Sequence, residues 1–512
     1  MKKYLKIKMP KYLNDKIKFQ NSNVKCQTNY KFQISNGKEE INLEWVDGFI
    51  KAVKPYIYVR EIDNLLILIP NQAYKLNQSG VAILSYLLKG NSIRKFIELI
   101  GDDEIKKREL HCFFCDLRAI VSGCLKEGEK REAVIYEQFK SDLNDYPVLS
   151  EIAVTYRCNL NCEFCYVGHK GYPELNTSDL KKIIFKIYNE ANVPSVSFTG
   201  GEPLLRKDIV SLVAYANKIG LWTNLITNGT MLTTDLVKSL KKAGLHSAQV
   251  SLEGPNGEIH DRITGVKDSF EKTINGIKYL LEEKIAVHTN TTVSRHNINH
   301  LEEILLLIKS LGLTRLSMNL MIPCGSAENR SDLWIPYSEI GPHILKVKHL
   351  AQKENIQFLW YSPVPMCEFN PIAYGLGNKS CAAITGLLSI DPMGNILPCS
   401  SWREPVGSFL KNNFKEIWYS PMLTYFKNAD YAPAECHKCI EFKICKGACP
   451  LFWKAFSVGT ISHGDIGRPT AKSWLETTPP RENISRTREA APLEANGFGG
   501  TFSPDKNPME NG

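Results

Sequence analysis

Cysteine spacing is the feature that most constrains the fold of this 512-residue chain, because most of its fifteen cysteines stand at short, fixed intervals. Three of them form the pattern Cys-x3-Cys-x2-Cys at Cys158, Cys162 and Cys165. In a reducing compartment, thiolates grouped in this way bind metal and do not build a disulfide framework. Six cysteines farther along the chain invite the same interpretation: Cys381, Cys399, Cys436, Cys439, Cys445 and Cys449.

Composition predicts a globular protein, with 43% hydrophobic and 23% charged residues. No apolar run approaches the roughly 18 residues that span a bilayer, and the basic N-terminus has no apolar stretch typical of a secretion signal. We therefore expect a cytoplasmic protein with no membrane segment. The net charge of +9 is concentrated near the N-terminus. It indicates a solvated basic tail rather than a nucleic-acid partner.

Changes in residue pattern along the chain predict its domains. The expected segments are a flexible basic N-terminus (1–45), a small domain (46–130), a linker (131–150), an α/β core (151–360), a cysteine-rich domain (361–456) and a disordered tail (457–512).

The small domain is predicted to be winged-helix-like. Its expected strands are 56–59, 65–69 and 74–76, and its expected helices are 80–88, 92–100 and 104–124.

The α/β core alternates strands with amphipathic helices, which predicts a parallel sheet, open or closed into a partial (β/α)6 TIM-like barrel. Active groups in such folds lie at the carboxyl ends of the strands. The expected strands are 151–156, 194–199, 222–227, 247–252, 285–293 and 314–321, and the helices are 178–191, 207–219, 233–243, 268–284 and 297–311.

The first cysteine group directly follows the first of these strands. Three thiolates can hold three irons of a 4Fe-4S cube and leave the fourth iron open to a ligand. The alternative is a structural zinc site that uses His169 as its fourth ligand. A second motif, SFTGGEPLL, ends the second strand, where Gly200 and Gly201 allow a close backbone approach and Pro203 stiffens the exit. Taken alone, it indicates only a tight strand-to-helix turn.

Together, CNLNCEFCY and GGEP in this βα context resemble the radical S-adenosylmethionine (radical SAM) superfamily. The resemblance implies that Cys158, Cys162 and Cys165 hold a 4Fe-4S cluster whose open iron chelates S-adenosylmethionine. It also implies reductive cleavage to methionine and a 5′-deoxyadenosyl radical, which takes a hydrogen atom from the substrate. The implied S-adenosylmethionine contacts are Gly200, Gly201, Glu202, Pro203, Ser251, Phe164 and Tyr166; for the two aromatic residues, core packing is the alternative.

The second cysteine region resembles the SPASM extension of peptide-modifying radical SAM enzymes, which carries up to two auxiliary clusters. The resemblance implies that Cys381, Cys399 and Cys449 hold one cluster, with Cys367 as a possible fourth ligand. It implies that Cys436, Cys439 and Cys445 hold the other.

The family pattern has a further cysteine downstream, and none follows Cys449 here. The second cluster then has an open iron, takes a ligand such as His463 or Asp465, or is absent; an unrelated tail is a further explanation. Cys324, after the sixth strand, is expected to be a buried structural cysteine, with a catalytic thiol as the alternative.

The stretch LLILIPNQAYKLNQSGVAILSYLLKG within residues 50–125 resembles the PqqD-like peptide-recognition domain of ribosomal-peptide maturases. Such domains bind a leader peptide as an added strand. The competing interpretation is a DNA-binding winged helix, which is disfavoured because its second helix carries only Arg94 and Lys95 as prominent basic residues.

These observations predict a radical SAM maturase that crosslinks or otherwise modifies a precursor peptide, which it binds through the leader. The enzyme would receive its electrons from a small protein such as flavodoxin or ferredoxin. The auxiliary clusters would accept the leftover electron or ligate the substrate. The alternatives are an enzyme of tetrapyrrole modification or sulfatase maturation, and a non-enzymatic iron–sulfur electron carrier or regulator.

Overall fold

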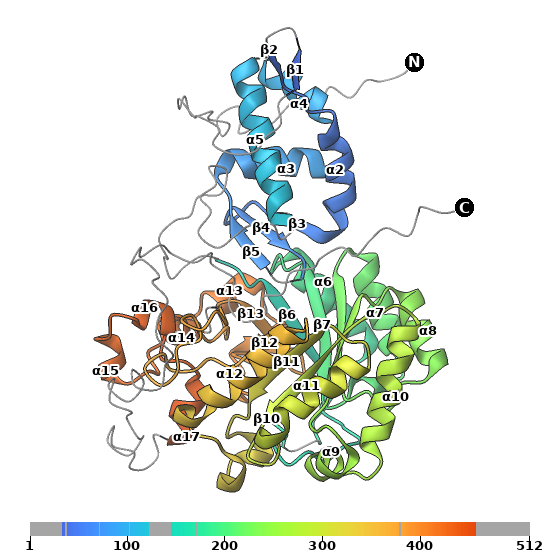
Figure 1. Ribbon diagram of the computed structural model, residues 1–512, viewed down its shortest axis with the longest axis vertical. Helices are drawn as coiled ribbons and strands as arrows, with labels where there is room; N and C mark the ends of the chain where they lie inside the picture. The colour runs from blue at the N-terminus through green and yellow to red at the C-terminus, as the bar shows by residue number, and fades with distance from the viewer. Residues whose placement is uncertain are drawn as a thin grey trace. The chain divides into compact units, whose positions relative to one another are not determined.

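The computed structural model describes residues 33–35, 38–70, 72–101, 103–121, 145–168, 171–377 and 380–456. It forms two compact units, which divide between residues 143 and 144 (Figure 1). The two units are described separately. The predicted tail at 457–512 and most of the predicted linker lie outside the described residues, although the last two linker positions belong to the first strand of the second unit.

The first unit contains a three-stranded antiparallel sheet in the order β3-β4-β5. A hairpin, β1 (Gln33–Ser35) and β2 (Lys38–Glu40), lies within the segment expected to be flexible. Helix α2 (Trp45–Val53) was not predicted. The other elements are β3 (Ile57–Arg60), β4 (Leu65–Leu68), β5 (Gln72–Lys75), α3 (Gln78–Leu88), α4 (Ile93–Ile100) and α5 (Glu104–Val121).

This unit has a hydrophobic core of its own. Val46 of α2, Leu66 of β4 and Phe114 of α5 are fully buried in one cluster. The β3–β4 turn is fixed by a buried ion pair, in which Arg60 donates two 2.8 Å hydrogen bonds to the carboxylate of Asp63.

The second unit is built on a ten-stranded sheet in the order β12-β11-β10-β9-β8-β7-β6-β13-β14-β15. The strands from β6 to β13 are parallel to their neighbours, whereas β14 and β15 pair antiparallel. The strands are β6 (Leu149–Thr155), β7 (Ser195–Gly200), β8 (Trp222–Thr227), β9 (Ser247–Ser251), β10 (Ala286–Val293), β11 (Arg315–Leu320), β12 (Gln357–Trp360), β13 (Leu387–Ile390), β14 (Asn395–Leu397) and β15 (Gly407–Ser408).

Helices surround this sheet in Figure 1. The apolar faces of these helices pack in the core, where Ile183 of α6 and Ile304 of α11 are fully buried. The helices of the α/β core are α6 (Thr177–Asn189), α7 (Ile209–Lys218), α8 (Thr234–Ala243), α9 (Gly257–Thr264), α10 (Ser269–Glu282), α11 (Leu301–Ser310) and α12 (Tyr337–Lys353). Shorter helices follow in the cysteine-rich region: α13 (Phe414–Trp418), α14 (Pro421–Lys427), α15 (Ala434–His437), α16 (Phe442–Cys445) and α17 (Pro450–Phe456).

The six predicted strands of the core all form, and the fold class is confirmed as an α/β partial barrel with a small antiparallel module before it and a cysteine-rich region after it. The sequence pattern missed α9, α12 and the seventh strand, β12. In the part of the chain that the structure describes, no helix is both long and apolar enough to cross a membrane.

Candidate functional site

The three cysteines of the first group lie on the loop that leaves β6, here called the cluster loop (residues 156–168). All three thiols are half-buried. The loop is held from α9, because the backbone N–H groups of Asn161 and Glu163 donate to the carbonyls of Thr264 and Ile263 at 2.9 and 3.1 Å. The last carbonyls of a helix have no partners within it, so α9 supplies acceptors that fix the loop.

Two glycines outside the cluster loop let other segments touch its backbone. A Cβ atom on Gly325, whose φ is +59°, would lie 2.4 Å from the carbonyl oxygen of Cys165. A Cβ atom on Gly265, at φ +70°, would lie 2.7 Å from the carbonyl oxygen of Asn161. Both positions need glycine for their conformation and for space.

Glu163, between the second and third cysteines, anchors the loop through its side chain. Its carboxylate lies 2.7 Å from Nδ1 of His296 and 3.7 Å from a guanidinium nitrogen of Arg330. The Glu163 side chain is only 13% exposed, so this contact is more strongly shielded from solvent than a surface ion pair.

The GGEP motif passes directly over the start of the cluster loop. The backbone N–H groups of Gly201 and Glu202 donate to the carbonyls of Thr155 and Arg157, both at 2.8 Å. A Cβ atom on Gly201 would lie 2.3 Å from the carbonyl oxygen of Arg157, so a larger residue cannot occupy this position without moving the loop.

Glu202 is fully buried, and its carboxylate is occupied by protein donors. It accepts hydrogen bonds from the hydroxyl of Thr227 at 2.8 Å and from the backbone N–H groups of Asn228 and Leu204 at 2.8 and 3.0 Å. Burial raises the pKa of Glu202 to about 7, although these hydrogen bonds oppose the shift. Glu202 therefore joins the ends of β7 and β8, and its predicted contact with S-adenosylmethionine stays a prediction.

Asn228 continues this connection to the first cysteine. Its side-chain amide lies 3.9 Å from Sγ of Cys158 and donates to Oδ1 of Asn159 at 2.9 Å. The sequence analysis did not select Asn228 as a site residue. Its place at the carboxyl end of a buried strand was the available signal.

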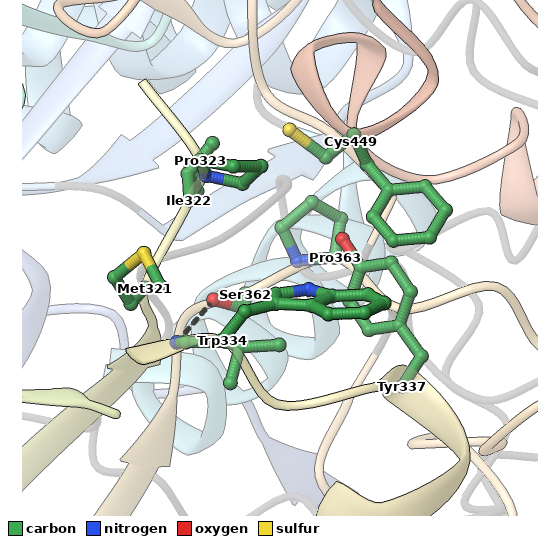
Figure 2. Close-up of a pocket in the computed structure, with 10 residues that line it drawn as sticks. Met321, Ile322, Pro323, Trp334, Tyr337, Ser362, Pro363 and Cys449 are labelled. Carbon is green, nitrogen blue, oxygen red and sulfur yellow. Dashed lines mark hydrogen bonds between the residues drawn. The ribbon is translucent and has the colours of Figure 1, made fainter. Parts of the chain in front are cut away.

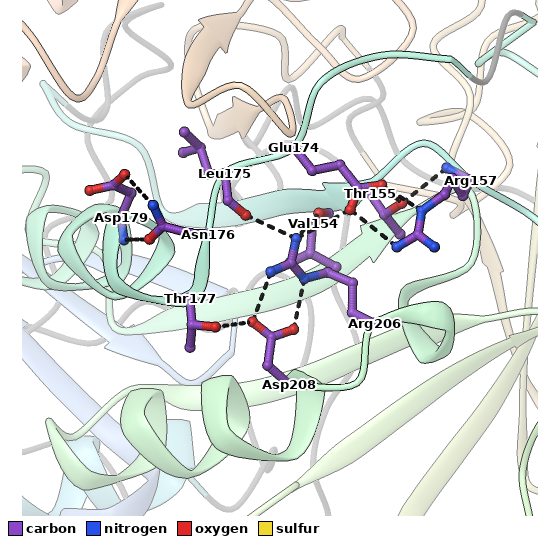
Figure 3. Close-up of polar contacts among 10 residues, drawn as sticks. All are labelled: Val154, Thr155, Arg157, Glu174, Leu175, Asn176, Thr177, Asp179, Arg206 and Asp208. Carbon is purple, nitrogen blue, oxygen red and sulfur yellow. Dashed lines mark hydrogen bonds and ion pairs between the residues drawn. The ribbon is translucent and has the colours of Figure 1, made fainter.

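A charged network fixes the segment that follows the cluster loop (Figure 3). Arg206 donates two hydrogen bonds to Asp208, at 2.9 and 2.7 Å, and also lies 3.4 Å from Glu174. Glu174 in turn accepts from Arg157 at 2.9 Å and from Thr155. Because the Arg206 side chain is only 8% exposed, this network holds the exits of β6 and β7 together.

The remaining predicted contacts lie near the carboxyl ends of the strands. The hydroxyl of Tyr166 donates to the carbonyl of Gly200 at 3.0 Å. Phe164 packs against a small cluster that contains Met321, and Pro203 is buried in the turn after β7. Ser251 is the half-buried last residue of β9.

Cys449 is buried among apolar residues beyond the end of β11. Figure 2 shows it beside Pro323, Trp334 and Tyr337, which line the same small pocket. Burial raises the pKa of Cys399, and the neighbouring Cys381 and Cys449 raise it further. That these three thiols hold one cluster stays a prediction.

Cys367 was predicted as a possible fourth member of that group, and this stays a prediction. The backbone N–H of Met366 donates to Sγ of Cys445 at 3.5 Å, which brings this turn to the other cysteine group. Cys324 is buried, and burial raises the pKa of its thiol to about 12, which favours the structural interpretation over a reactive thiolate.

The gathered donors are thiols, which are the ligands that iron–sulfur clusters use. Among the residues that the structure describes, no three Cys, His, Asp or Glu side chains are arranged to hold one metal ion. The chemistry of these donors therefore fits clusters. His169, the fourth ligand in the zinc alternative, lies outside the described residues.

Residues 152–319 match the family described as the radical SAM superfamily, and residues 381–440 match SPASM, an iron–sulfur cluster-binding domain. The chain is a radical SAM enzyme with a SPASM domain. Its cofactors are accordingly a 4Fe-4S cluster with S-adenosylmethionine and auxiliary iron–sulfur clusters. Both family resemblances that underlie this assignment are confirmed.

Two curated relatives of this radical SAM enzyme have different activities. AdoMet-dependent heme synthase of Nitratidesulfovibrio vulgaris is 28% identical over 57% of this chain and 85% of that protein. PqqA peptide cyclase of Bradyrhizobium diazoefficiens is 27% identical over 70% of this chain and 96% of that protein. The crystal structure of Streptococcus suis SuiB bound to precursor peptide SuiA superposes with a TM-score of 0.60 and 18% identity, covering 78% of this chain and 95% of SuiB.

Proposed function

We propose that this radical SAM enzyme modifies a ribosomally made precursor peptide, which it binds through the leader segment. The observation that carries the proposal is the first unit. A three-stranded antiparallel sheet with its own helical core precedes the radical SAM core in the same chain. Its sequence resembles PqqD-like peptide-recognition domains, and an added strand is a common way to bind an extended peptide.

The sheet offers a peptide two edges, β3 and β5. Tyr56 and Ile69 form a hydrogen-bonded pair, since the N–H of Ile69 donates to the carbonyl of Tyr56 at 2.8 Å. Antiparallel pairs alternate, so the backbone groups of Ile57 and Val59 point away from β4. The same argument, starting from the 2.9 Å bond between Leu76 and Asn64, directs the backbone groups of Ala73 and Lys75 outward on β5.

In the core, Cys158, Cys162 and Cys165 would hold the cluster, and Gly200, Gly201 and Ser251 would line the S-adenosylmethionine site. When bound, these groups supply reductive cleavage of S-adenosylmethionine and abstraction of a hydrogen atom. The chain itself positions the cluster loop, which is fixed by contacts with α9 and Gly325 and by the side chain of Glu163. The physiological electron donor in this proposal is a small protein such as flavodoxin or ferredoxin.

The comparisons support a peptide substrate. PqqA peptide cyclase, named for action on a peptide, aligns with 70% of this chain. The SuiB superposition covers 78% of this chain, more than residues 144–456 alone provide, so the fold match extends beyond the core and the cysteine-rich region.

A second candidate is tetrapyrrole modification, because AdoMet-dependent heme synthase matches at 28% identity over most of its length. This candidate assigns no role to an edge-strand peptide site in the first unit.

The test is anaerobic incubation with S-adenosylmethionine, dithionite and the peptide encoded nearest the gene. We expect 5′-deoxyadenosine together with a changed peptide mass, such as the loss of two hydrogen atoms on crosslinking. Removal of the peptide's leader should abolish the change. Conversion of a tetrapyrrole, with the peptide unchanged, would establish the second candidate instead.

A further inference from the structure

The segment after β12 returns to the cysteine-rich region before the first SPASM cysteine. Residues 363–368 form a turn in which the N–H of Glu368 donates to the carbonyl of Pro365 at 2.8 Å. Within it, the N–H of Met366 donates to Sγ of Cys445 at 3.5 Å. The next residue is Cys367, which is therefore one peptide unit from Met366, the donor of this hydrogen bond to Cys445.

Cys436 lies on α15 (Ala434–His437) and Cys445 ends α16 (Phe442–Cys445), while Cys439 lies in the connection between these two short helices. The N–H of Cys439 donates to the carbonyl of Cys436 at 2.9 Å, which closes the Cys-x2-Cys turn. The N–H of Phe442 donates to the carbonyl of Cys439 at 3.1 Å, and the N–H of Cys445 donates to the carbonyl of Glu441 at 2.9 Å. The three cysteines therefore belong to one continuous series of turns.

The turn between Cys445 and Cys449 separates the two cysteine groups. Lys446, Gly447 and Ala448 all have positive φ, from +52° to +70°, which reverses the chain sharply. Trp453 stabilises this turn by donating from its indole to the carbonyl of Gly447 at 2.6 Å. Cys449 therefore lies beyond this reversal of the chain, whereas the sulfur of Cys445 accepts the hydrogen bond from Met366.

We propose that Cys367 is the fourth ligand of the second auxiliary cluster and completes a four-thiolate site with Cys436, Cys439 and Cys445. The ligand comes from upstream of the SPASM domain, so this cluster needs neither a downstream cysteine nor an open iron. Full thiolate ligation leaves no iron free to bind a substrate, which points to electron transfer as the role of this cluster. The proposal rests on the SPASM assignment and does not depend on the nature of the substrate.

Thiol footprinting tests the proposal without any substitution. The full-length chain is alkylated under anaerobic conditions before and after cluster reconstitution, and each cysteine is quantified by mass spectrometry against denatured protein. Cys367 is exposed in the cluster-free chain and should be alkylated there. We expect reconstitution to protect Cys367 to the same extent as Cys439. Rapid alkylation of Cys367 in protein whose Cys436, Cys439 and Cys445 are protected would overturn the assignment.

Paired substitutions test which group Cys367 joins, in a background where Cys158, Cys162 and Cys165 are alanine. We expect Cys367→Ala to alter the iron content and the electron paramagnetic resonance spectrum as Cys439→Ala does. The Cys367→Ala/Cys439→Ala double variant should show little further change, whereas Cys367→Ala/Cys381→Ala should lose both clusters. An unchanged spectrum in Cys367→Ala would contradict the proposal. So would a Cys367→Ala/Cys381→Ala variant that shows little change beyond Cys381→Ala alone. Circular dichroism confirms that each variant is folded.

Discussion

The carboxylate of Glu202 accepts a 2.8 Å hydrogen bond from the backbone N–H of Asn228, so one buried side chain joins the ends of β7 and β8. The other contacts of Asn228 lead to Sγ of Cys158 and to Asn159 in the cluster loop. The GGEP glutamate thus acts on the cluster loop through a chain of protein hydrogen bonds.

This relationship predicts a pH dependence of stability. The pKa of Glu202 is about 7 in the folded protein, above its ordinary value of 4.5, so the folded state binds more protons between these values. The free energy of unfolding should therefore fall as pH rises from about 4.5 to about 7, by up to about 1.4 kcal/mol per pH unit from this group.

Glu202→Gln should remove this contribution to the dependence of the free energy of unfolding on pH. Anaerobic urea unfolding, monitored by circular dichroism at several pH values, measures that dependence. Glu258→Gln, at an exposed position on α9, is the control and should leave the slope unchanged. Equal slopes for wild type and Glu202→Gln would contradict the linkage argument.

Gly325 gives a second prediction, because a matched glycine separates conformation from crowding. Gly312 also has a positive φ, +76°, but a Cβ atom there would have nothing within 4 Å. Gly312→Ala should cost about 1–2 kcal/mol from backbone conformation alone. Gly325→Ala should cost roughly 1–3 kcal/mol more, because its Cβ atom meets the cluster-loop backbone.

The expected signature of Gly325→Ala is loss of bound iron from the first cluster at a temperature where Gly312→Ala retains it. Equal iron retention in the two variants would show that the Gly325 contact does not hold the loop.

The contact between Glu163 and His296 predicts how firmly the loop retains its cluster. His296→Ala should weaken this anchor by about 1 kcal/mol, which corresponds to severalfold faster cluster loss to a chelator. His300→Ala is a matched control, since His300 pairs with Glu303 at 3.0 Å at the exposed start of α11. The visible absorbance of the cluster measures the rate of its loss. Identical rates in the two variants would show that the contact between Glu163 and His296 does not help the loop retain its cluster.

The two sheet edges of the first unit predict where a leader peptide binds. Val59→Pro and Lys75→Pro each remove an outward N–H without removing a hydrogen bond to β4. One of them should weaken leader binding roughly tenfold, as expected for a lost backbone hydrogen bond. Fluorescence anisotropy with a labelled leader measures this effect, and unchanged affinity in both variants would exclude strand addition.

The parallel strand β7 was predictable because apolar and polar residues alternate in it, with Val196 and Phe198 buried on either side of Ser197. Helix α12 was missed because Pro342 lies inside it and interrupts the helical pattern. Helix α9 is short and polar, but Asn256 as its N-cap and Gly265 as its C-cap were signals that mark its ends.

The site was predictable where spacing along the chain determines it, as for Cys158, Cys162 and Cys165. Spacing does not show which cysteines from separate segments meet. The position of Cys367 depends on the hydrogen bond between Met366 and Cys445, which are far apart in sequence. Likewise, the role of Glu202 depends on donors from β8 and the residue after it, which the GGEP motif does not contain.

The central claim is that the three-cysteine loop leaves one iron open to S-adenosylmethionine. Electron paramagnetic resonance of the dithionite-reduced protein, recorded with and without S-adenosylmethionine, tests it most directly. The account predicts that the added compound shifts one cluster signal in wild type, and that no such shift occurs when Cys158, Cys162 and Cys165 are alanine. Superimposable wild-type spectra with and without S-adenosylmethionine would contradict it.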